Sequence, residues 1–162
     1  ESIKRIAQPN LFAGLCDVIY RLLTIGEWEN RELFKRQIAP YIMEGVKSIN
    51  NLAAFQSQTR ILLKHLFNQE EDIQTIKNTL IELVRANIQY TLTPKHTDNE
   101  TDLLWRLRLG FESLMEFNIN IYETDTDEII LENLQDRCNN QTDPNAVDVK
   151  ALLEIMKTKR GN

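Results

Sequence analysis

Apolar residues recur every three or four positions along almost the whole chain, which is the period of an α-helix and not the two-residue period of a strand. Turn and capping residues divide this pattern into segments. The expected helices cover approximately residues 11–25, 31–49, 52–67, 69–88, 102–117, 125–138 and 144–160. The sequence therefore predicts an all-α fold of about seven antiparallel helices.

Residue types that stabilise helix ends support these divisions. Short polar side chains cap free backbone N–H groups at helix starts, and glycine favours the left-handed conformation that often ends a helix. The expected N-caps are Asn10, Asn68, Thr124 and Asp143, and the expected stop of the first helix is Gly26.

Two of the expected helices have features that affect their packing. The first carries Leu11 and Val18 on a face other than its main apolar row, so we expect it to be well buried. The second contains Pro40, which cannot donate to the carbonyl of Arg36. Because the apolar row continues in phase across this proline, we expect one kinked helix over residues 31–48.

Two segments do not follow the helical pattern. Residues 93–99 are polar and contain a proline, so we expect the most mobile internal loop there, with preferential cleavage by proteases. Residues 117–122 alternate between apolar and polar types as a strand does. Since no partner strand is evident, we expect an extended connection.

The spacing of the expected helices leaves two architectures open. Helix midpoints lie about 20 to 30 residues apart, so a helical pair has roughly the length of a HEAT or armadillo unit. A closed helical bundle with short loops has the same spacing.

We expect a single domain over residues 1–162, with a possible subdivision at residues 93–99. Since the chain begins at Glu1 without a methionine, we expect it to be excised from a larger protein.

Charge is unevenly distributed. Residues 98–148 hold 3 Lys/Arg against 13 Asp/Glu, whereas residues 1–97 hold 12 against 10. Nucleic acids bind by phosphate neutralisation, so this balance argues against nucleic acid as a main partner and favours a partner with a basic segment.

The apolar runs are too short to span a membrane. Two cysteines without a disulfide framework favour an intracellular protein, cytoplasmic or nuclear.

Residues suited to catalysis are few. His65 has no acidic residue or second histidine at helical metal-site spacing, and His96 lies in the polar loop. Cys16 and Cys138 occupy apolar helix positions, where a thiol is usually inert. The glycines are spread singly, so no phosphate-binding loop is present. We therefore expect no enzyme activity, no cofactor and no metal.

These observations favour a non-catalytic scaffold or adaptor domain that binds a protein or peptide through a helical groove or an acidic face. Two alternatives remain. One is a compact bundle that buries a partner's amphipathic helix, as apoptosis regulators do. The other is a secreted cytokine-like bundle, which would be glycosylated at Asn99 or Asn140. The candidate partner-binding residues are Trp28, Ile121, Tyr122, Glu123, Asp125, Asp127, Glu128 and Glu132.

Overall fold

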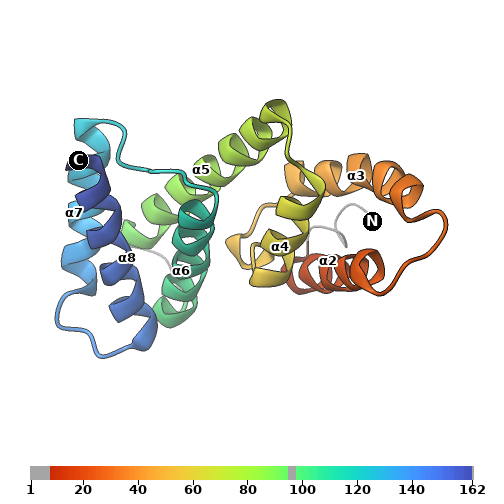
Figure 1. The fold of residues 1–162 in the computed structure, drawn as a ribbon. Coiled ribbons are helices and arrows are strands. Elements are labelled where there is room, and N and C mark those ends of the chain that lie inside the picture. The colour runs from red at the N-terminus through yellow and green to blue at the C-terminus, as the bar shows by residue number, and fades with distance from the viewer. Residues whose placement is uncertain (1–7, 95–97, 162) are drawn as a thin grey trace. The chain divides into compact units, whose positions relative to one another are not determined.

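The computed structural model describes residues 8–94 and 98–161, and these ranges contain seven α-helices, one 3-10 helix and no strand (Figure 1). The elements are α2 (Pro9–Thr24), α3 (Arg31–Lys47), η1 (Leu52–Ala54), α4 (Ser57–Leu66), α5 (Glu70–Leu92), α6 (Glu100–Glu116), α7 (Asp125–Cys138) and α8 (Pro144–Gly161). The all-α expectation is confirmed. No helix in the described ranges combines the length and apolarity needed to cross a membrane.

The chain forms two compact units, residues 1–79 and residues 80–162, and the boundary falls inside α5. This boundary lies before the polar loop, residues 93–99, where the sequence predicts a possible subdivision. That loop includes residues 95–97, which lie outside the described residues. The expectations of one domain and of first cleavage in the loop therefore stay predictions.

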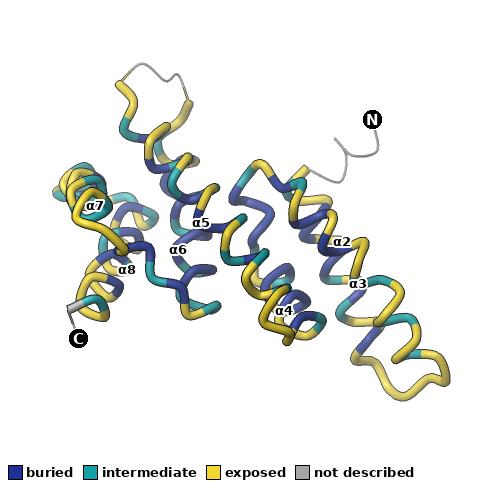
Figure 2. The backbone as a smooth tube through the Cα atoms, turned by 90° about the horizontal axis from the view of Figure 1, so that it is seen from above, coloured by how far each residue is buried: buried dark blue, intermediate teal, exposed yellow. Residues whose placement is uncertain are grey.

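In the first unit, α2 packs mainly on α4 and on η1. Figure 2 shows that buried and exposed residues alternate along α2, so only one side of this helix faces the interior. The buried apolar side chains from these elements include Phe12, Cys16, Ile19, Leu23, Leu52, Phe55, Leu62 and Leu63. Burying a side chain of this size stabilises a fold by roughly 1.5 to 3 kcal/mol.

The predicted start of the first helix was wrong. The helix begins at Pro9 with Gln8 as N-cap, since proline at the first helical position loses no hydrogen bond there. The side chain of Asn10 does not cap this helix. Its Oδ1 instead accepts a hydrogen bond of 3.0 Å from Gln56 Nε2, which links α2 to the start of α4.

The predicted third helix, residues 52–67, is in fact two elements. Asn51 Oδ1 accepts a 2.9 Å hydrogen bond from the backbone N–H of Ala53, which starts the separate 3-10 turn η1. The carbonyls at the break are satisfied by the next helix: Thr59 Oγ1 donates to Ala54 O at 2.6 Å, and Arg60 Nη1 donates to Phe55 O at 2.7 Å. Thr59 and Arg60 are both buried. The pattern of apolar residues in the sequence does not predict the burial of such polar side chains.

Helix α3 is one continuous helix with Pro40 inside it, as the in-phase apolar row predicted. Helix α3 ends at Lys47, and its C-cap is Ser48, whose backbone N–H and hydroxyl both donate to Glu44 O. A single helix places Gly45 and Tyr41 on the side that faces or borders α2, which positions the groove described below.

In the second unit, α6 and α7 both pack on α8. Helix α6 starts two residues before the predicted position, because Asn99 Oδ1 accepts from the N–H groups of Thr101 and Asp102. The predicted capping box of Thr124 and Asp127 is confirmed at the start of α7. The alternating run before it forms no strand in the described residues, and Asn118 adopts a positive φ of 57°.

Candidate functional site

Among the acidic candidates, the Asp127 side chain forms both hydrogen bonds and an ion pair within the chain. Its Oδ2 accepts hydrogen bonds from the backbone N–H groups of Thr124 at 3.0 Å and Glu123 at 3.2 Å. The same oxygen lies 3.3 Å from Arg85 Nη2. Because this carboxylate caps α7 and pairs with a cation from α5, its contacts are explained by the fold.

The other acidic candidates also have basic neighbours within the chain. The ion pairs are Glu123–Arg85 at 3.5 Å, Asp125–Arg160 at 3.6 Å, Glu128–Arg160 at 3.2 Å and Glu132–Lys157 at 3.7 Å. Lys157 and Arg160 come from the later part of α8 and lie outside the acidic segment 98–148. The folded chain therefore balances part of the local charge that a count along the sequence leaves uncompensated.

Ile121 and Tyr122 are buried, so they do not present the accessible apolar contact expected of this extended run. Burial, with smaller effects of the Glu128 and Glu132 carboxylates, raises the pKa of Tyr122 to about 12. These side chains belong to the interior of the second unit. Ile121 also lines the cavity described below.

Trp28 lies over the end of α2 and remains partly exposed, at 39%. Its Nε1 donates a 2.9 Å hydrogen bond to Leu22 O, and its ring centroid is 5.7 Å from that of Phe34 at the start of α3. The indole therefore links the two helices. Only its outer part could contact a partner.

A row of apolar side chains on α2 and its C-cap is exposed, contrary to the expectation that this helix is well buried. Its members are Leu11, Leu15, Val18, Leu22 and Ile25, each between 44% and 67% exposed. We call this row the α2 stripe. Its spacing of 4, 3, 4 and 3 residues is the heptad spacing of a helix that packs along another helix. The sequence contains this signal, but a second apolar row interleaved with it forms the core face.

A groove between α2 and α3 adjoins the α2 stripe, because Leu15 belongs to both. It has a volume of about 310 Å³. The residues that line this α2–α3 groove are Phe12, Leu15, Ile19, Ile38, Tyr41, Ile42, Glu44, Gly45 and Ser48. Tyr41 is 75% exposed at its edge. The stripe and the groove together form a mainly apolar surface on the first unit.

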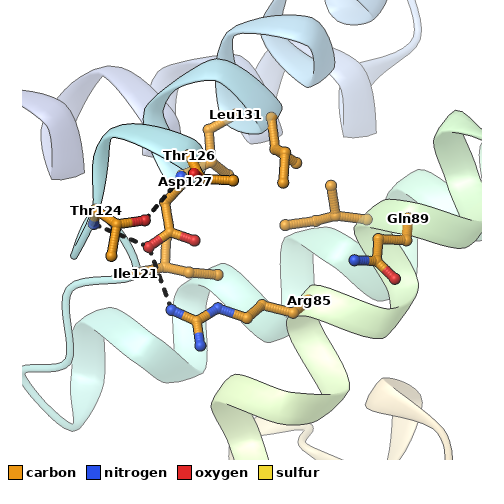
Figure 3. Close-up of a pocket in the computed structure, with 9 residues that line it drawn as sticks. Arg85, Gln89, Ile121, Thr124, Thr126, Asp127 and Leu131 are labelled. Atoms are coloured by element: carbon orange, nitrogen blue, oxygen red, sulfur yellow. Dashed lines mark hydrogen bonds and ion pairs between the residues drawn. The ribbon is translucent and has the colours of Figure 1, made fainter.

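A second cavity, also about 310 Å³, lies in the second unit between α5 and α7 (Figure 3). Its lining residues are Arg85, Ile88, Gln89, Ile121, Thr124, Thr126, Asp127, Ile130 and Leu131. We call it the α5–α7 cavity. Apart from Ile121, Asp127 and the capping Thr124, sequence reasoning missed these residues. No periodic signal marks them, since two helices and a connection bring them together.

The remaining chemistry-bearing residues have structural surroundings. The Cys16 and Cys138 thiols are buried, which raises their pKa values to about 12 and about 11. The His65 ring packs edge-on against Tyr20 at 5.6 Å, and burial lowers its pKa. Among the described residues, no group of three or more His, Cys, Asp or Glu side chains is placed to hold a metal ion.

Comparison of the chain with family models, with curated proteins and with solved structures gives no match in any of the three.

Proposed function

We propose that this chain is a non-catalytic protein-interaction domain that binds an amphipathic helix of a partner protein along the α2 stripe and the α2–α3 groove. The exposure of the α2 stripe carries this proposal. Five large aliphatic side chains in heptad register form a contiguous exposed apolar surface, and such surfaces on folded proteins mark interaction sites. The occupant is a helix because the 4-3-4-3 spacing matches the a and d positions of a helix lying nearly parallel to α2.

The apolar surface is a better candidate than the acidic face. Glu123, Glu128 and Glu132 already have intrachain cations, so a basic partner would compete with existing ion pairs. An open stack of helical pairs, of the HEAT or armadillo kind, fits this proposal better than a closed bundle. A closed bundle would bury an apolar stripe inside its core.

The expected affinity is modest. Covering five half-exposed aliphatic side chains contributes about 1 kcal/mol each, and association costs at least about 4 kcal/mol. The α2 stripe alone therefore falls short of a stable complex, and contacts in the α2–α3 groove, including Tyr41, must supply the rest. We expect dissociation constants of about 1 μM or weaker.

Selection from a displayed library of helical peptides tests the proposal. The wild-type chain should enrich peptides whose apolar residues follow the spacing of three and four, and Val18→Glu should abolish their binding. Ile129→Glu is the matched control, since Ile129 is a similarly exposed aliphatic residue in the second unit. Peptides that bind the wild type and Val18→Glu equally would refute the site. If the wild-type chain self-associates as its concentration rises and Val18→Glu abolishes this, the molecule bound at the site is a second copy of the chain and not a helix of a partner protein.

A further inference from the structure

Gly14 is exposed in the interior of α2, where glycine destabilises a helix relative to alanine. The two other glycines of the first unit have structural reasons. Gly26 has a positive φ of 55°, and Gly45 lies against the ring of Phe12. Neither reason applies to Gly14, whose backbone is helical. Apart from its own turn of helix, no described atom lies within 4 Å of where its β-carbon would be. The fold of the first unit therefore does not require glycine at this position.

Gly14 borders the α2 stripe. In a helix, the residues at positions i, i+3, i+4 and i+7 surround one hole on the surface, into which a neighbouring helix can insert a side chain. The four residues in this relation are Leu11, Gly14, Leu15 and Val18. Three of them are exposed members of the stripe, and the fourth has no side chain. The hole is therefore wide, and we call it the Gly14 hole.

The next hole along the stripe is bounded by a long side chain in place of glycine. Its four residues are Val18, Arg21, Leu22 and Ile25. The Arg21 side chain is 71% exposed and pairs with Asp17 at 3.2 Å, so it occupies the corner that is open at Gly14. A helix lying along the stripe therefore meets one wide and one narrow hole, about two turns apart.

A single glycine suits a partner's side chain better than a partner's backbone. Helices whose backbones approach closely usually carry small residues four positions apart, as membrane helices do. The positions four residues before and after Gly14 hold Asn10 and Val18, which are not small. The space at Gly14 is therefore local, and it matches one inserted side chain.

We propose that the partner helix inserts a bulky apolar side chain, of the size of leucine or larger, into the Gly14 hole. This inference rests on the proposed function, because it specifies which feature of the partner helix the α2 stripe recognises. Side chains of packed helices fill the available space closely, so the width of a hole selects the side chain that fits it. The Gly14 hole consequently favours helices with a bulky residue at one defined place in their apolar row.

Substitution of Gly14 tests this proposal with the peptides that the wild-type chain selects. Gly14→Ala and Gly14→Leu fill the hole in two steps, so both should weaken binding, the leucine variant by at least about fivefold. The direction of the change is informative. Leucine adds apolar surface to the stripe and alanine favours the helix, so a site that needed only apolar area would bind at least as tightly in both variants.

A size exchange locates the bulky side chain. Alanine scanning of the peptide should reveal one position whose truncation weakens binding to the wild type but improves binding to Gly14→Leu, because the shorter side chain makes room for the leucine. Ala151→Leu is the matched control. It adds the same side chain at an exposed position of α8, in the second unit, and should leave the affinity of both peptides unchanged. Unfolding followed by Trp28 fluorescence checks that the Gly14 variants are folded.

The possible results separate this proposal from the proposed function. A wild-type chain that selects no helical peptide overturns both. If Gly14→Ala and Gly14→Leu bind as tightly as the wild type while Val18→Glu abolishes binding, the α2 site stands and the role of the Gly14 hole is overturned. If Gly14→Leu weakens binding and no truncated peptide restores it, the insertion of a bulky side chain is overturned. Should the leucine variant not fold, Gly14→Ala provides the same comparison.

Discussion

Gly45 of α3 lies so close to the ring of Phe12 in α2 that a β-carbon at position 45 would stand 2.5 Å from Phe12 Cε2. Phe12 is fully buried, so its ring has little room to retreat. The close approach of α2 and α3 therefore depends on glycine at this position. The α2–α3 groove, which both residues line, depends on it as well.

Gly45→Ala should consequently destabilise the first unit. Overpacking costs about 1 to 3 kcal/mol, and the better helix propensity of alanine recovers about 1 kcal/mol, so we expect a net loss of about 1 kcal/mol. Gly14→Ala is the matched control. A β-carbon there meets nothing within 4 Å, so this variant should be stabilised by up to about 1 kcal/mol.

Urea unfolding followed by Trp28 fluorescence, with Trp105→Phe as background, measures both glycine variants in the first unit. Trp28 suits this purpose because it contacts Phe34 at the start of α3. Equal stabilisation by the two alanines would show that the Phe12 ring adjusts without cost.

The Gly45 contact also shows where sequence reasoning stops. The apolar row of α3 placed Gly45 on the correct face, but its neighbour Phe12 is more than thirty positions away. For the same reason, the apolar pattern of α2 predicted that this segment is helical but did not predict which of its faces is buried. Both apolar rows of α2 look alike in sequence, and only the packing of α4 and η1 distinguishes the buried row from the α2 stripe.

Local signals were more reliable where both interacting groups are close in sequence. The capping box of Thr124 and Asp127 spans three residues and was predicted correctly. The ion pair between Glu128 and Arg160 spans thirty-two residues and was not. The composition of the segment 98–148 is therefore acidic, but its folded surface also includes a cation from outside the segment, Arg160.

Loss of the cap at α7 should be measurable. Thr124→Ala removes the side chain that accepts from Asp127 N at 3.1 Å, and such a change costs typically about 1 kcal/mol. Thr126→Ala, two residues further on at an exposed position, should be neutral or slightly stabilising. Trp105 fluorescence in a Trp28→Phe background reports unfolding of the second unit. Equal losses in the two variants would argue against the capping role.

Alkaline pH should weaken the fold through its buried thiols. Burial raises the pKa of Cys16 to about 12 and that of Cys138 to about 11, from an ordinary value of 9.0. Because the folded pKa values are higher, their contribution to stability is fully present below about pH 9. It is lost as the pH rises through the folded values, at up to about 1.4 kcal/mol per pH unit for each thiol.

Thermal unfolding between pH 8 and 11 tests this linkage. The melting temperature should fall above about pH 9, and Cys138→Ala should reduce the slope even though its cavity lowers stability at neutral pH. Iodoacetamide should react with neither thiol in the native chain at neutral pH, since both are buried. An unchanged alkaline slope in Cys138→Ala would mean that another group, such as Tyr122, governs the transition.

The acidic-face hypothesis and the proposed α2 site make opposite predictions for a charge reversal. Glu123 lies 3.5 Å from Arg85 and Glu132 lies 3.7 Å from Lys157, and both carboxylates are about half exposed. Exposed pairs of this kind contribute at most about 1 kcal/mol, so Glu123→Lys with Glu132→Lys should leave the second unit folded.

Binding of the selected helical peptide to this double variant then decides between the two surfaces. If the α2 stripe is the site, the dissociation constant should change less than about threefold, whereas Val18→Glu, which places a charge in the middle of the stripe, should raise it more than tenfold. An acidic docking face would instead give a slower association rate in the double variant and a rate that falls with added salt, since such steering is screened over about 8 Å at physiological ionic strength. A salt-dependent loss of binding in the double variant, with Val18→Glu unaffected, would move the partner site from the first unit to the second.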